Sequence, residues 1–79
     1  MNLDILIEYM RFKGYKESTI KQTKNYARRI IEYGFEDEDD IRDELWDKTK
    51  HVRREFARAF RLLKEAERWW NNEVKKRNN

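Results

Sequence analysis

Apolar residues in this chain recur every three or four positions, as in amphipathic helices, and no stretch alternates in the manner of a strand. Leu3, Leu6 and Met10 share one face of the first such segment. The longest series occupies residues 52–74. The pattern predicts an all-α fold, a compact four-helix bundle with a long C-terminal helix, in one domain spanning residues 1–79. The predicted helices lie at about residues 3–13, 17–33, 38–46 and 48–75.

The turns between these helices have recognisable sequence signals. Gly14 and Gly34 are the only glycines, and the chain has no proline. Gly14 is expected to follow the first helix in a left-handed conformation, with Tyr15 packing back on the helix end. Short polar side chains are expected to cap the later helices. The candidate caps are Ser18 or Thr19 for the second helix and Asp47 or Thr49 for the last.

Charge is strongly segregated along the chain, although the net charge is only +3. Residues 11–29 carry seven bases against one acid, and residues 30–47 carry nine acids against one base. Residues 48–79 carry eleven bases against four acids. Two basic blocks therefore flank an acidic one, and this pattern favours a polyanionic partner.

Several functional classes are not supported by the composition. The chain has no cysteine and a single histidine, His51, so neither a disulfide framework nor a zinc site is expected. The acidic run at residues 36–40 lacks the ligand spacing of a calcium loop, and helix capping with solvated charge is the favoured interpretation. We expect no catalytic residue, metal, cofactor or small-molecule substrate. With no apolar run of ~20 residues and no signal peptide, we expect a cytoplasmic protein without a membrane partner.

Basic side chains gather on the second and last predicted helices, opposite their apolar faces. Ordinary solvated faces mix charges of both signs, whereas these two contain few acids. Lys and Arg can contact phosphates, and Asn or Arg can also read a base edge. The candidate DNA-binding residues are Lys16, Lys21, Lys24, Asn25, Arg28, Lys50, Arg53, Arg54 and Arg61.

The tandem Trp69–Trp70 is unusual because adjacent helical residues point about 100° apart. Trp70 continues the apolar stripe of the last helix, whereas Trp69 points towards its edge. One interpretation is that Trp69 shields the end of the first helix. The other is that Trp69 and Trp70 form a candidate partner interface with another chain or domain.

Residues 6–34, LIEYMRFKGYKESTIKQTKNYARRIIEYG, resemble the N-terminal core-binding (SAM-like) domain of tyrosine recombinases and phage-type integrases. That family commonly shows G-x-S-x-x-T-[IL] at the start of a basic helix, and Gly14, Thr19 and Ile20 match it. Lys16 replaces the usual Ser, and Thr23 stands where an aromatic residue is common. The segment VRREFARAFRLLKEAERWW is similar to the family's last helix. The resemblance covers about residues 3–72.

The resemblance implies a helical bundle that clamps one face of double-stranded DNA, with the second and fourth helices towards the major groove. It also implies that catalysis belongs to a separate C-terminal domain, so this chain is not expected to cut or join DNA by itself. Candidate partners are double-stranded DNA, such a catalytic domain and sister protomers on a mobile element. The alternatives are a helical protein-interaction module that uses Trp69, Trp70 and the acidic segment, and an engineered bundle without a ligand.

Overall fold

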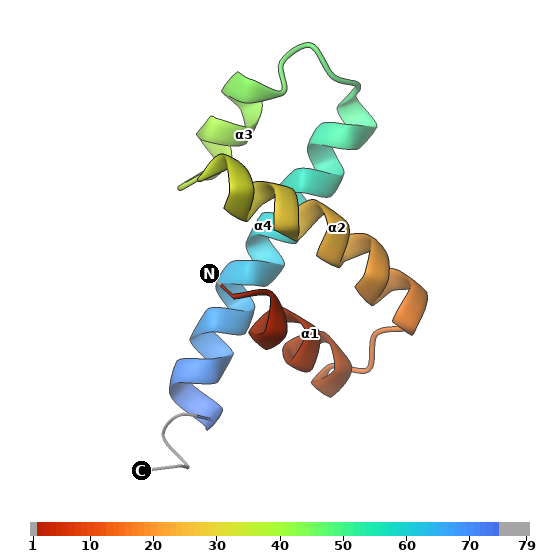
Figure 1. The fold of residues 1–79 in the computed structure, drawn as a ribbon, viewed down its shortest axis with the longest axis vertical. Coiled ribbons are helices and arrows are strands. Elements are labelled where there is room, and N and C mark those ends of the chain that lie inside the picture. The colour runs from red at the N-terminus through yellow and green to blue at the C-terminus, as the bar shows by residue number, and fades with distance from the viewer. Residues whose placement is uncertain (1, 75–79) are drawn as a thin grey trace.

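A computed structural model describes residues 2–74, and these residues form helices and no strand. The helices are α1 (Leu3–Phe12), α2 (Glu17–Tyr33), α3 (Glu38–Glu44) and α4 (Lys50–Trp69). A π-helical turn, η1 (Trp70–Val74), continues α4 (Figure 1). The predicted all-α, four-helix architecture is therefore confirmed.

Helix α4 is the longest and forms the spine of the molecule (Figure 1). Helices α1 and α2 pack against α4 and against each other, and α3 packs against α4. The apolar stripe of α4 serves all three neighbours because it persists over the whole helix. One core results, formed by Leu6, Met10, Ile20, Ala27, Ile30, Phe35, Ile41, Leu45, Phe56, Ala59, Phe60, Leu62, Leu63 and Ala66.

The chain leaves α1 and α2 through two left-handed glycines, Gly14 at φ 85° and Gly34 at φ 72°. In both turns the next residue donates its backbone N–H to the helix carbonyl five positions earlier, at 3.0 Å for Tyr15 and 3.2 Å for Phe35. This is the Schellman arrangement, in which an apolar residue after the glycine folds back onto the helix. Tyr15 packs against the core as predicted, and Phe35 is buried within it.

The helix caps correct part of the sequence interpretation. Helix α2 begins after Lys16 without any side-chain cap, so the expected caps Ser18 and Thr19 are wrong. Both lie inside the first turn of the helix, two and three residues beyond the capping position at Lys16. At α4 the prediction of Thr49 is confirmed, because its hydroxyl accepts from the Val52 N–H at 3.3 Å.

Helix ends and one core position also differ from the expectation. Helix α3 ends at Glu44, two residues early, and Trp46 is 75 % exposed. Helix α4 begins at Lys50 rather than residue 48, and its α-helical geometry ends at Trp69. The predicted end of the last helix at residue 75 lies outside the described residues. Helical periodicity predicts that both Ile30 and Ile31 lie on the inner face of α2, but Ile31 is 39 % exposed because the adjacent Ile30 takes the buried direction.

The capping difference gives a stability test. Thr49→Ala removes an acceptor for a first-turn N–H of α4 and is expected to lower the free energy of unfolding by about 1 kcal/mol. Ser18→Ala is the matched control, since it removes no cap and should change stability by less than about 0.5 kcal/mol. Urea denaturation followed by circular dichroism measures both. Equal losses in the two variants would contradict the assigned caps.

Candidate nucleic-acid interface

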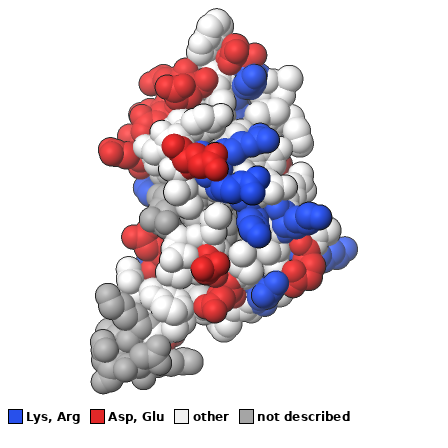
Figure 2. All heavy atoms as spheres, viewed as in Figure 1, with Lys and Arg blue, Asp and Glu red and all other residues white. Residues whose placement is uncertain are grey.

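The basic face of α2 lies on the outside of the bundle. Lys21, Lys24 and Arg28 are exposed because they point away from Ile20 and Ala27, which are buried. Figure 2 shows Lys and Arg atoms in a band along the line that α2 follows in Figure 1, with Asp and Glu gathered over the region of α3. None of these three cations forms an ion pair within residues 2–74.

Further polar groups lie next to this basic face of α2. Lys16 precedes the first turn of α2 and is exposed, and Asn25 is exposed beside the basic stripe. A groove of about 440 Å³ between α1 and α2 brings Lys21 and Lys24 beside Arg11. Arg11 is held there by Glu17, with the Arg11 Nε to Glu17 Oε1 distance at 3.1 Å. The Glu17 carboxylate is thus already paired with another base.

A second basic surface lies along the N-terminal half of α4. Lys50, Arg53 and Arg54 line a groove of about 380 Å³ between α3 and α4. Lys50 and Arg54 are exposed, whereas Arg53 is half-buried beside the groove. Within the described residues none of the three forms an ion pair.

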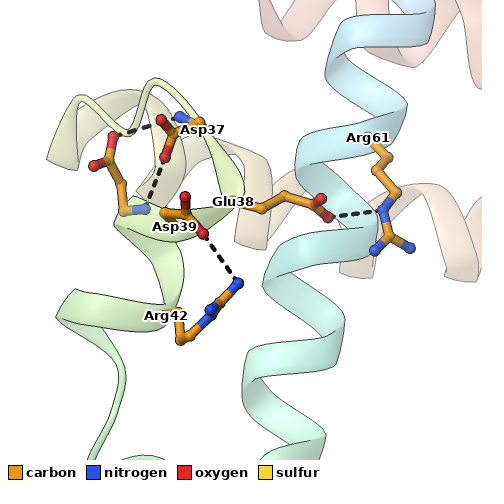
Figure 3. A network of polar contacts seen from close by, with 6 residues as sticks. Asp37, Glu38, Asp39, Arg42 and Arg61 are labelled. Carbon is orange, nitrogen blue, oxygen red and sulfur yellow. Dashed lines mark hydrogen bonds and ion pairs between the residues drawn. The ribbon is translucent and has the colours of Figure 1, made fainter.

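The α3–α4 groove contains acids that are already engaged (Figure 3). Glu38 reaches across from α3 to Arg61, with Glu38 Oε1 at 2.7 Å from Arg61 Nε. Asp39 accepts from Arg42 at 3.0 Å on α3 itself. Arg61 therefore differs from the other eight predicted DNA-binding residues, because it has an acidic partner.

Other carboxylates of the acidic segment cap α3. Asp37 Oδ1 accepts from the Asp40 N–H at 2.9 Å, and Asp40 Oδ2 accepts from the Glu36 N–H at 2.8 Å. Together with the reciprocal bond to the Asp37 N–H, these contacts form a capping box. The interpretation of this run as helix capping is confirmed for Asp37 and Asp40.

The basic stripe of α2 and most of that of α4 point in opposite directions; the exception is the half-buried Arg53, which at 100° per residue points only about 60° from Phe56. Tyr26 of α2 packs edge-on against Phe56 of α4, with ring centroids 5.0 Å apart. At 100° per residue, Lys24 and Arg28 point about 160° away from Tyr26, and Arg54 points about 160° away from Phe56. The structure therefore divides the predicted site residues between two surfaces, which we call the α2 surface (Lys16, Lys21, Lys24, Asn25, Arg28) and the α4 surface (Lys50, Arg53, Arg54, Arg61).

The aromatic residues at the far end of α4 pack on α1. Trp69 lies 5.6 Å from Tyr9 and 5.3 Å from Phe12 between ring centroids, and Trp70 contacts Trp69 at 6.5 Å. Shielding of the first helix by Trp69 is confirmed. A groove of about 650 Å³ remains beside this cluster, and Phe12 is 68 % exposed there. The sequence analysis did not identify Tyr9 and Phe12 as the partners of Trp69. The only signal in the sequence was that these two aromatic residues lie off the apolar face of α1.

The phenol of Tyr9 offers a probe of this packing. Burial raises the pKa of Tyr9 above its usual value near 10, and the charge of Glu65, which accepts from the Tyr9 hydroxyl at 3.3 Å, adds to the rise. The Tyr9 hydroxyl therefore loses its proton more readily in the unfolded chain than in the folded one. The stabilisation linked to this proton is fully present below pH 10 and is lost as the pH rises through the pKa of the folded state. In ultraviolet titration, Tyr9→Phe should remove the tyrosine that ionises late. Loss of an early-ionising tyrosine instead would contradict the assignment.

Comparisons with known proteins give no assignment: no family model, no curated protein and no solved structure matches the chain. Within residues 2–74 no helix combines the length and apolar character needed to cross a membrane. The relation to the recombinase core-binding domain therefore stays a prediction from the sequence.

Proposed function

We propose that this domain binds double-stranded DNA by placing the α2 surface against the phosphate backbone. The observation that carries the proposal is the row of exposed cations on α2, Lys21, Lys24 and Arg28, which have no acidic partner within the described residues. Solvated surfaces of helical proteins usually intersperse both charges. A row of one sign along about two turns suits the closely spaced negative charges of a duplex.

Each residue of the α2 surface has a distinct part in this mode of binding. The lysines act as point charges near phosphates, and the guanidinium of Arg28 can donate two parallel hydrogen bonds to one phosphate. Asn25 lies beside them and offers the amide donor and acceptor that fit the edge of adenine. Binding is then mostly independent of sequence, with limited base readout through one side chain.

The finer proposal is that the domain serves as the core-binding arm of a tyrosine recombinase or integrase. Its support is the resemblance around Gly14, Thr19 and Ile20 together with the helical bundle in which α2 carries the basic face. In this role the domain positions DNA, and the strand cleavage is performed by a separate catalytic domain. The chain itself supplies no nucleophile to the reaction.

Fluorescence anisotropy with a labelled duplex of random sequence tests DNA binding. If Lys16, Lys21, Lys24 and Arg28 each neutralise one phosphate, a plot of the logarithm of the association constant against the logarithm of the salt concentration should have a slope of about −3.6. The paired substitution Lys24→Gln with Arg28→Gln should weaken binding at the α2 surface roughly tenfold and make the slope for that surface less steep by about 2.

The matched control removes the same charge elsewhere. Lys13→Gln with Arg68→Gln changes two residues that line the groove beside Trp69, outside both basic surfaces, so it should leave affinity and slope nearly unchanged. Equal weakening by the two paired variants would mean that net charge alone drives binding. Absence of binding at low salt would reject the proposal and favour the other candidate, a helical protein-interaction module using the groove beside Trp69.

A further inference from the structure

The two basic surfaces occupy opposite sides of the domain. Helix α2 crosses in front of α4 in Figure 1 and behind it in Figure 3, where the α3–α4 groove faces the viewer. We propose that the domain holds two DNA duplexes at once, one on the α2 surface and one on the α4 surface, and so bridges them. This inference rests on the proposed DNA binding of the α2 surface and adds a second binding site.

The α4 surface is suited to a phosphate backbone. Lys50, Arg53 and Arg54 line the same open groove, and they have no acidic partner among residues 2–74. The first turn of α4 begins at Lys50, so the positive end of the helix dipole adds to the same potential. The nearby acids Glu38 and Asp39 are held in ion pairs, which reduces their repulsion of an incoming phosphate.

One straight duplex cannot reach both surfaces. The domain measures 45 × 25 × 15 Å, and Figure 1 views it down the shortest of these axes. DNA has a persistence length of about 150 base pairs, so bending it around such a small body is costly. Conversely, the 15 Å thickness exceeds the Debye length of about 10 Å at 0.1 M salt, so two duplexes on opposite sides repel each other only weakly.

Stoichiometry measures the number of sites directly. Native mass spectrometry of the full chain with a duplex of about 12 base pairs, roughly one helical turn, should show complexes with one and with two duplexes. The paired variants Lys24→Gln with Arg28→Gln and Arg53→Gln with Arg54→Gln should each show at most one. At a duplex concentration near the wild-type Kd, the variant carrying all four substitutions should show little complex, because each surface is weakened roughly tenfold. Circular dichroism establishes that each variant is folded.

Bridging is measured by capture of a fluorescent duplex on beads that carry a different, immobilised duplex. The wild-type protein should retain the fluorescent duplex, and either paired variant should reduce this capture roughly tenfold, as expected from losing two phosphate contacts. The control Lys13→Gln with Arg68→Gln should retain it as the wild-type protein does.

The outcomes separate the two proposals. A wild-type complex limited to one duplex, together with intact anisotropy binding, would overturn bridging and leave the proposed function standing. Full capture by Arg53→Gln with Arg54→Gln would also overturn it, because bridging would then come from association of protein chains through the α2 surface alone. Absence of duplex binding in every assay would overturn both proposals.

Discussion

The packing of α4 against all three other helices is the constraint on which the molecule depends. Phe56, Phe60 and Leu63 of α4 are each no more than 2 % exposed, and they supply the centre of the single core. In a chain of 79 residues such a core is shallow, so one long helix must serve every neighbour. Because α2 occupies one side of α4, the charged side of α4 is left to face the opposite direction.

The acidic segment has a structural role that explains why it coexists with two basic surfaces. Asp37 and Asp40 satisfy backbone N–H groups at the start of α3, a helix of seven residues that is too short to be stable alone. Glu38 then joins α3 to α4 through Arg61. Both partners are substantially exposed, so this ion pair contributes little to stability and serves mainly to orient α3. Among residues 2–74, Lys50, Arg53 and Arg54 are then the cations of the groove that form no ion pair.

At the C-terminal end of α4, aromatic side chains rather than charged groups hold the helices together. Trp69 lies against Tyr9 and Phe12, where α1 ends, and η1 then winds more widely from Trp70. Single π-helical turns often lie at functional sites, and here the turn borders the groove of about 650 Å³ beside Trp69. The far end of α4 is therefore held by ring contacts, whereas its beginning is held by a hydroxyl cap.

The sequence alone determined the local structure, and it did so because helix periodicity and glycine conformation act within a few residues. It predicted α2 with correct ends, the left-handed Gly14, the buried Leu6 and Met10, and the apolar stripe of α4. It also identified the cations, since their types and spacing are written in the chain. Only the tertiary structure decided which of Ile30 and Ile31 is buried, that Phe35 folds back into the core and that Glu38 meets Arg61 across 23 positions. The direction of each basic stripe depends on how α2 and α4 pack around Tyr26 and Phe56, and periodicity within one helix carries no information about that relative rotation.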